Sequence, residues 1–232
     1  MEHLRRVVSE WFVRLQDIAF WSQSFASGQP FSMAGHAQAM IPLLGWDVLE
    51  RVLGSPDPID LMTVRQGQLI DCASPRARGD VEALFRRGVS TVVRAAERHD
   101  GGLAALASSF EAAAAGRAHV QLYATPGGTN SYGWHFDFED VFIIQTAGTK
   151  DYYFRDNTVA GDVTLGAPMD FTAIRRETSP VYTARLIAGD WLYIPSRWWH
   201  LVKCVDDALS ISTGVMPPRE LVRARRVPQG WA

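Results

Sequence analysis

The sequence predicts a mainly β fold with an α-helical N-terminal half, because the texture of the chain changes near residue 118. Before that point, apolar residues recur at helical spacing and candidate helices end at glycines. After it, short β-branched and aromatic runs are separated by Gly, Pro and Asp, with no long helical pattern between them. Strands at such close spacing favour antiparallel sheets that close into a sandwich or barrel.

The first half carries several helical signals. Val7, Val8, Trp11, Phe12 and Leu15 form one apolar stripe of an amphipathic helix. Further helices are predicted for WDVLERVL, GDVEALFRRG and GGLAALASSFEAAAAG, the last by propensity. Between them, TVRQGQLID alternates like a short hairpin and STVVRA is rich in valine.

The second half contains the runs that predict strands. They are HVQLYAT, VFIIQTA, KDYYFR, VYTARLI, DWLYIP and ALSISTGV. VFIIQ and KDYYF flank Thr-Ala-Gly-Thr, which predicts a hairpin loop. We therefore expect a single domain, with residues 1–117 mostly helical and packed on a β core at 118–216, followed by a C-terminal tail at 217–232.

Composition limits the classes of partner. A chain of 232 residues, 47% of them hydrophobic, can bury a full core as one domain. Its 23 basic and 25 acidic residues nearly balance, so neither nucleic acid nor an anionic membrane is an expected partner. The one local basic patch, Arg219 to Arg226, is as consistent with a solvated terminus. Two scattered cysteines and no apolar signal-like or spanning segment favour a cytoplasmic protein.

The stretch WHFDFED, residues 134–140, places a histidine and a carboxylate two positions apart. In a strand, residues i and i+2 share a face and lie ~6.6 Å apart, so His135 and Asp137 can converge on one ion. Phe136 would then point away into packing. The alternative is an ordinary hydrogen-bonded pair at a strand end, and two ligands do not hold a labile divalent metal.

His200 is the candidate third ligand. It ends the run AGDWLYIPSRWWH, in which a Gly-Asp turn starts a strand and Pro195 stops it. Of the other histidines, His3, His36 and His99 lie in the helical half, and His119 begins a strand without a nearby acidic partner in the sequence. Two histidines and one carboxylate form the facial triad of non-haem Fe(II), which leaves adjacent coordination positions open. Zinc hydrolases use the same ligand types, so the triad alone does not name the metal.

The stretches LYATPGGTNSYGWHFDFEDVFIIQTAGTKDYYF and AGDWLYIPSRWWH resemble the Jumonji C oxygenases, most closely the branch that hydroxylates ribosomal proteins. In that branch an LTPPG-type turn precedes His-x-Asp, and a segment ending in WWH brings the distal histidine. The resemblance extends more loosely to WDVLERVL and VEALFRRGVS. It implies a double-stranded β-helix of the jelly-roll or cupin kind, flanked by helices, that binds Fe(II), 2-oxoglutarate and O₂.

Lys150 is the predicted anchor of the co-substrate. 2-Oxoglutarate chelates iron through its keto-acid end and leaves a distal carboxylate that needs a buried cation. If the strand runs on from residue 135 without a bulge, alternation across a two-residue loop puts Lys150 on the face of Asp137 and His135. The resembled family carries a basic residue here for that carboxylate. The alternative is an exposed hairpin lysine.

Three further side chains are weaker co-substrate candidates. Tyr123 stands where the resembled family has a tyrosine that assists the basic residue, although it also suits a core aromatic. Ser212 and Thr213, on the strand after His200, could bind the co-substrate or His200, and alternation alone does not choose between them.

Tyr132, Trp134 and Trp198 are the predicted walls of a substrate pocket. Trp134 stands where the resembled enzymes usually carry a small residue or proline. The alternative for each tryptophan is a simple core position beside a sheet.

The sequence thus predicts an Fe(II)- and 2-oxoglutarate-dependent oxygenase that hydroxylates a peptide or protein side chain. A free amino acid or a natural-product intermediate is the second substrate class. A non-oxidative metal-dependent cupin isomerase or binding module is an alternative of another class, and it has no need of Lys150 as an inward cation. The protein could be a monomer or a homodimer.

Overall fold

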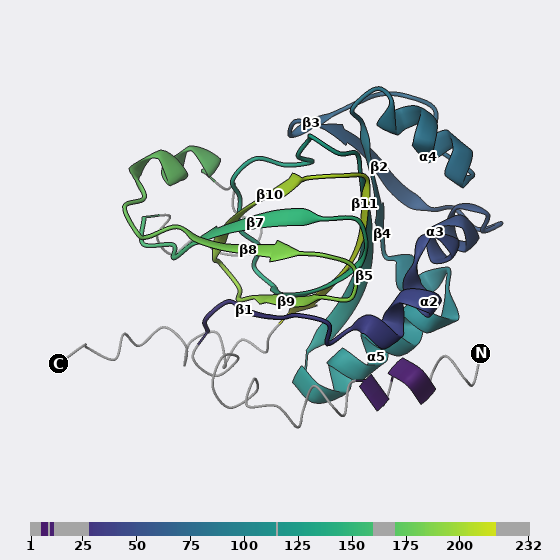
Figure 1. The fold of residues 1–232 in the computed structure, drawn as a ribbon, viewed down its shortest axis with the longest axis horizontal. Coiled ribbons are helices and arrows are strands. Elements are labelled where there is room, and N and C mark those ends of the chain that lie inside the picture. The colour runs from purple at the N-terminus through teal and green to yellow at the C-terminus, as the bar shows by residue number, and fades with distance from the viewer. Residues whose placement is uncertain (1–5, 9, 12–27, 115, 160–169, 217–232) are drawn as a thin grey trace.

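Two antiparallel sheets face each other and enclose the interior of the molecule (Figure 1). The computed structural model describes residues 6–8, 10–11, 28–114, 116–159 and 170–216. The strand order is β1-β9-β6-β11-β5-β4-β2-β3 in the large sheet and β10-β7-β8 in the small one. This arrangement confirms the predicted jelly-roll core flanked by helices.

The large sheet has eight strands. They are β1 (Phe31–Met33), β2 (Asp60–Arg65), β3 (Gln68–Leu69), β4 (Ser90–Arg94), β5 (Arg117–Thr125), β6 (Asp140–Ala147), β9 (Trp191–Ile194) and β11 (Ala208–Met216). The small sheet contains β7 (Lys150–Arg155), β8 (Tyr182–Leu186) and β10 (Trp199–Cys204). All runs predicted as strands in the second half are strands, whereas β10 was not predicted.

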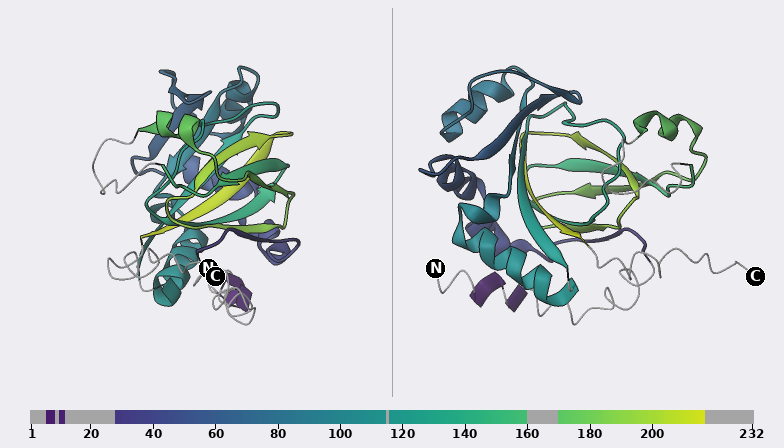
Figure 2. Two further views of the ribbon diagram at one scale, coloured as in Figure 1. Left: turned by 90° about the vertical axis from the view of Figure 1, so that its left-hand side faces the viewer. Right: turned by 180° about the vertical axis from the view of Figure 1, so that it is seen from behind.

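Helices cover the outer face of the large sheet, and a short helical segment lies on the opposite side of the molecule (Figure 2). The α-helices are α2 (Ile41–Leu44), α3 (Trp46–Leu53), α4 (Arg78–Phe85) and α5 (Gly101–Ala114). The 3₁₀ turns are η2 (Gln38–Met40), η3 (Ala96–Arg98) and η4 (Phe171–Arg176). Residues 6–8 and 10–11 are also helical, with Val8 and Trp11 buried as the stripe predicts. Phe12 and Leu15 lie outside the described residues.

Helix α5 begins where the sequence places it, because Asp100 satisfies its first free amides. The Asp100 Oδ1 atom accepts hydrogen bonds from the amides of Gly102 and Leu103, at 2.8 and 3.2 Å. Its apolar side chains then reach the large sheet, where the rings of Phe110 and Phe142 lie with centroids 4.5 Å apart.

Strand β6 separates two cores because it is apolar on both faces. Phe142 and Ile144 belong to the cluster shared with the helices. Val141 and Ile143 belong to a second cluster between the sheets. A strand that is buried on both faces has a continuous hydrophobic sequence, and VFII in β6 is such a sequence.

The first half is less helical than predicted. Besides the helices it contributes β1 to β4, which extend the large sheet at both of its edges. The Val-rich segment forms β4, which pairs with β5, and the predicted hairpin is confirmed by the pairing of Val64 with Leu69. These strands form because the edge of β5 offers unpaired backbone groups, which local sequence alone does not reveal.

The predicted hairpin between VFIIQ and KDYYF is wrong. Strand β6 pairs with β9 and β11 on its two sides, so it has no free edge for β7. Strand β7 instead pairs with β8 and β10 in the small sheet. Gly148 and Thr149 therefore carry the chain from one sheet to the other, and Gly148 adopts a φ of +68° at this corner.

Two expectations from the sequence concern the C-terminal tail and membrane-spanning segments. The tail at 217–232, including the Arg219 to Arg226 patch, lies outside the described residues. Within the described part of the chain, no helix combines the length and the apolar character needed to cross a bilayer.

Candidate metal centre

His135 and His200 are joined through their backbones. The amide of His135 donates to the carbonyl of His200 at 3.1 Å, and the amide of His200 donates to that of His135 at 2.8 Å. His200 lies on β10, whereas His135 forms an isolated bridge outside the regular strands. The prediction that His135 and Asp137 lie on a strand is therefore wrong, because β6 begins only at Asp140.

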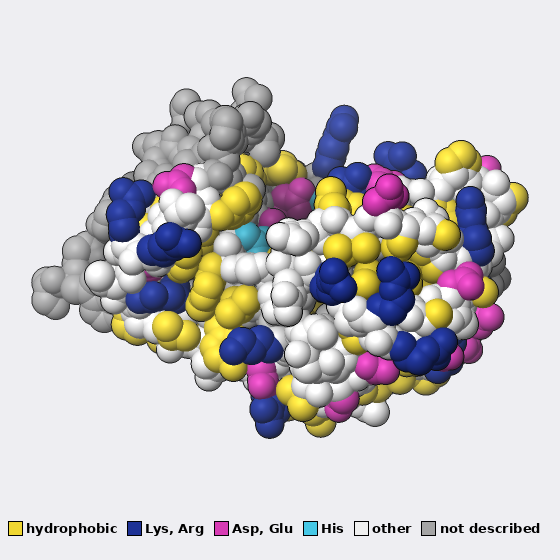
Figure 3. All heavy atoms as spheres, turned by 90° about the horizontal axis from the view of Figure 1, so that it is seen from above, with side chains coloured by type: hydrophobic (Ala, Val, Ile, Leu, Met, Phe, Trp, Pro, Cys, Tyr) yellow, Lys and Arg dark blue, Asp and Glu magenta, His cyan; other side chains and the backbone are white. Residues whose placement is uncertain are grey.

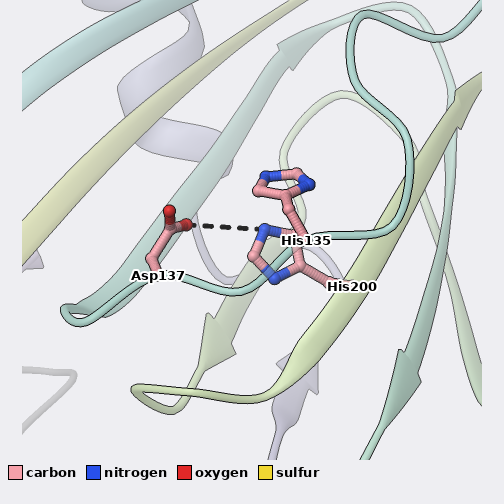
Figure 4. A group of neighbouring side chains, drawn as sticks. All are labelled: His135, Asp137 and His200. Atoms are coloured by element: carbon pink, nitrogen blue, oxygen red, sulfur yellow. Dashed lines mark ion pairs between the residues drawn. The ribbon is translucent and has the colours of Figure 1, made fainter. Parts of the chain in front are cut away.

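The predicted alternation nevertheless holds locally. Phe136 turns away from its two neighbours and is buried against Trp199, with ring centroids 4.9 Å apart. His135 and Asp137 turn to the opposite side and meet His200 (Figure 4). One nitrogen of each imidazole and one oxygen of the carboxylate all lie within 4.8 Å of one another. The Nε2 atom of His200 is 3.5 Å from Oδ2 of Asp137, and the imidazole centroids are 4.2 Å apart.

Hydrogen bonds on the far side of each imidazole suit metal binding. Nδ1 of His135 lies 2.8 Å from the carbonyl of Gly133, and Nδ1 of His200 lies 3.0 Å from that of Trp198. A carbonyl only accepts, so Nδ1 carries the proton and Nε2 keeps its lone pair for an ion. Burial, followed by the nearby His135, lowers the pKa of His200 to about 4, which favours the neutral ring that a metal requires. The three side chains therefore fit a divalent metal with two imidazoles and one carboxylate.

A cavity between the two sheets adjoins this triad. It opens to solvent on the side of the triad, where Tyr132, His135 and Asp137 are partly accessible. Figure 3 shows a recess on one face of the molecule, with a histidine and acidic side chains at its wall and hydrophobic side chains around it. The closed end, called the floor below, is formed by Thr125, Lys150, Tyr152, Cys204 and Ser210, each no more than 4% exposed.

Lys150 lies in the floor, on the same cavity as the triad. Its Nζ atom is 3.4 Å from the carbonyl of Tyr123 and 3.5 Å from Oγ1 of Thr125. Among the described residues no carboxylate lies within ion-pair distance of this ammonium, and burial lowers the pKa of Lys150. Lys150 points into the cavity, as predicted. The alternative of an exposed lysine in a hairpin does not agree with the structure.

Of the other predicted co-substrate residues, Tyr123 and Ser212 line the cavity and Thr213 does not. Tyr123 lines the cavity, but its hydroxyl donates to Oε1 of Gln121 at 2.9 Å. Ser212 also lines the cavity. Thr213 is buried on the opposite face of β11, because it alternates with Ser212. Of these two residues, only Ser212 faces the cavity.

Of the predicted pocket walls, only Tyr132 contributes to the cavity. Trp134 packs with Phe136 and Trp199, since alternation places it opposite His135. Trp198 precedes β10, so strand alternation does not set its direction. Its Nε1 atom donates to the carbonyl of Gly28 at 3.0 Å, and its ring packs in the cluster between the sheets. The prediction that Trp134 and Trp198 wall this pocket is wrong.

Sequence reasoning missed several floor residues that a simple signal would have found. Tyr152 follows Lys150 by two positions on β7, and Ser210 precedes Ser212 by two on β11. Cys204 follows His200 by four on β10. Each therefore shares a face with a predicted cavity residue.

His119 has an acidic partner that the sequence did not reveal. Its Nε2 atom lies 3.3 Å from Oε2 of Glu139 and 2.9 Å from Nε2 of Gln121. A side chain at position 214 would collide with both His119 and Glu139, so Gly214 makes room for this pair. Gln121, His119 and Glu139 form a row of polar contacts. The row begins at the Tyr123 hydroxyl and ends at Glu139, two residues after Asp137.

Fold and site together define a class of protein, a double-stranded β-helix with a two-histidine, one-carboxylate centre beside a cavity that ends in a buried cation. Residues 102–221 match the JmjC domain family, and the chain belongs to that family.

Part of this chain is similar to segments of longer proteins. The bifunctional lysine-specific demethylase and histidyl-hydroxylase NO66 of Dictyostelium discoideum is 29% identical over 92 residues, which are 40% of this chain and 18% of that protein. Ribosomal oxygenase 1 of Danio rerio is 32% identical over 95 residues, or 40% of this chain and 17% of that one. This chain thus spans under a fifth of the length of these curated relatives.

The solved structures support the fold. The structure of YcfD, a ribosomal oxygenase from Escherichia coli, in complex with cobalt and 2-oxoglutarate matches with a TM-score of 0.60 and 19% identity. It covers 91% of this chain and 58% of the YcfD chain. Another structure of E. coli YcfD matches with a TM-score of 0.66. The similarity at this identity establishes the shared fold.

Proposed function

We propose that this protein is an Fe(II)- and 2-oxoglutarate-dependent oxygenase that hydroxylates an unactivated C–H bond of a peptide or protein side chain. The observation that carries the proposal is the shared cavity, with the His135, Asp137 and His200 triad towards its exposed side and Lys150 in its floor. A metal hydrolase has no need of a buried ammonium with no carboxylate partner in the described residues.

The residues divide the work between the two ends of the co-substrate. His135, Asp137 and His200 would hold the metal on one face and leave adjacent positions open for a bidentate ligand and O₂. When bound, iron with 2-oxoglutarate and O₂ supplies the oxidation, which yields succinate, CO₂ and a hydroxylated product. Lys150 would neutralise the distal carboxylate. Val141 and Ile143 form an apolar wall that excludes water between these ends.

A side chain of a peptide or protein is the preferred substrate. Membership of the JmjC domain family and the similarity to proteins named as ribosomal oxygenases support this choice. A free amino acid or a natural-product intermediate is the second candidate. Activity with a short peptide, compared with activity with its free target amino acid, distinguishes the two substrate classes. A peptide or protein hydroxylase should lose activity when only the free amino acid is supplied.

We further propose that the described residues form one domain that acts in the cytoplasm as a monomer or a homodimer, without nucleic acid as substrate. The sheet shared by strands of both halves supports a single unit. The presence of only two cysteines, both free in the structure, suits a reducing compartment. Sedimentation of the full chain at several concentrations would establish its oligomeric state.

The decisive experiment loads the protein anaerobically with Fe(II) and 2-oxoglutarate and measures succinate after exposure to air. Wild type should release succinate, with more released once the correct substrate is present. His200→Ala should release none because the metal is lost, and Lys150→Ala should require a much higher concentration of 2-oxoglutarate. No succinate from wild type across a peptide library would favour the non-oxidative cupin alternative.

A further inference from the structure

The three candidate ligands come from two segments of the chain that lie side by side. His135 and Asp137 belong to residues 135–140, which lead into β6, and His200 follows the turn at residues 195–198, between β9 and β10. The backbones of His135 and His200 pair at one end of this arrangement. The Asp137 side chain is 41% exposed, so packing alone does not set its direction. The position of this carboxylate therefore depends on what holds its backbone.

A backbone contact from the turn reaches Asp137. The amide of Arg197 donates to the Asp137 carbonyl at 2.7 Å, and a hydrogen bond of 3.2 Å from the Trp198 amide to the Pro195 carbonyl closes the turn. Arg197 has a φ of +70° at the third position of this four-residue turn, where glycine is the usual residue. A residue with a side chain keeps this conformation only where its surroundings hold it. The turn therefore needs support from other contacts.

Ser196 supplies that support through two donors. Its hydroxyl donates to the carbonyl of Phe138 at 2.8 Å, one residue after Asp137. Its amide donates to Oδ1 of Asp140 at 3.1 Å, and the same oxygen accepts from the Tyr193 hydroxyl at 2.8 Å. Because Asp140 is only 1% exposed, its carboxylate needs donors of this kind. Ser196 thus joins the turn to the segment between Asp137 and β6.

We infer that Ser196 is a positioning residue for the metal centre. Its hydroxyl holds the backbone beside Asp137 against the turn that precedes His200, so the carboxylate and the second imidazole keep one separation when a metal binds. In this arrangement Nε2 of His200 lies 3.5 Å from Oδ2 of Asp137. The inference rests on the proposed function through the metal centre alone, and it adds a residue that acts through the ligands rather than as one of them.

The link between the two segments can be cut at Ser196 without opening the core. Ser196 is partly accessible, and loss of its hydroxyl leaves the buried Asp140 carboxylate with its amide and phenol donors. Ser179 offers a matched control, because it is also partly accessible. Its hydroxyl likewise donates at 2.8 Å to a backbone carbonyl distant in sequence, that of Asp156, in the connection between β7 and β8.

The test measures Co(II) binding to the full chain by titration calorimetry and records the visible absorption of bound Co(II), which depends on the number and geometry of its ligands. Ser196→Ala should weaken Co(II) binding about tenfold or more, as is usual for groups that orient metal ligands, and should alter the spectrum at saturating Co(II). Ser196→Thr keeps a hydroxyl and should restore both properties. Ser179→Ala should change the affinity by less than about twofold and leave the spectrum as in wild type.

The outcomes separate the inference from the proposed function. If wild type binds no Co(II), the proposed function fails together with the metal centre. If wild type binds Co(II) and Ser196→Ala leaves either the affinity or the spectrum unchanged, the inference is overturned while the proposed function stands. A Ser196→Ala variant that does not fold, or an effect of equal size in Ser179→Ala, would assign the hydroxyl to stability and would also overturn it. The same holds if Ser196→Thr does not recover binding.

Discussion

His135 and His200 exchange a reciprocal pair of backbone hydrogen bonds, and their imidazole centroids lie 4.2 Å apart. A backbone bridge of this kind keeps the Cα atoms of two ligands next to each other, whatever the intervening chain does. The fold therefore supplies preorganisation, and a metal need only complete the site with Asp137.

Divalent metal should stabilise the protein through this centre. At a free Mn(II) concentration one hundred times Kd, the free energy of unfolding should rise by about 2.7 kcal/mol, because only the folded chain presents the three ligands together. His200→Ala should abolish the increase, measured by thermal unfolding with and without the ion. His99→Ala, which changes a histidine bonded to Ser55 away from the triad, should keep it. An unchanged metal effect in His200→Ala would exclude the assigned site.

Binding of 2-oxoglutarate should weaken at alkaline pH through Lys150. The ammonium form attracts the distal carboxylate, and burial lowers the pKa of this ammonium in the free protein. Affinity should therefore be full below that pKa and fall as pH rises through it, at a lower pH than an ordinary lysine would show. Calorimetry of the Mn(II)-loaded protein across pH measures the effect. Lys150→Arg should bind with little alkaline loss, because a guanidinium stays protonated.

Cys204 should report occupancy of the floor. Burial raises the pKa of its thiol, so the reactive thiolate is scarce at neutral pH and alkylation should be slow. In a Cys72→Ser variant, which leaves Cys204 as the single cysteine, metal with 2-oxoglutarate should slow alkylation further by about tenfold or more. Intact-mass spectrometry over time measures both rates. Equal rates with and without 2-oxoglutarate would show that the ligand binds elsewhere.

Gly148 should be intolerant of a side chain. It carries the chain from β6 to β7 at a φ of +68°, and a Cβ there would collide with the backbone of Asp207 and Ala208. Gly148→Ala should lower the free energy of unfolding by about 2–4 kcal/mol, measured by urea denaturation, since backbone clash adds to the left-handed strain. Gly79→Ala, in helix α4 with nothing near its Cβ position, should be neutral or stabilising by up to about 1 kcal/mol. A Gly148→Ala variant as stable as wild type would contradict the tight corner.

The sequence determined the types and spacing of the groups that matter. The His135-Phe136-Asp137 spacing placed two ligands on one side even without a regular strand, because alternation is a property of extended backbone. Lys150 faces the cavity as predicted, although the hairpin and the unbroken strand from which its direction was inferred do not form. Strand-forming runs and the start of helix α5 likewise follow from local composition.

Only the tertiary structure decided which groups meet. The crossing of the chain between sheets at Gly148, the pairing of His119 with Glu139 and the hydrogen bond from Ser210 to Gln145 all depend on contacts between segments distant in sequence. The directions of Trp134 and Trp198 were set by the aromatic packing available around the small sheet. Local propensity acts within a few residues, whereas sheet pairing and burial act across the whole fold, so the wall of the cavity could not be read from the sequence alone.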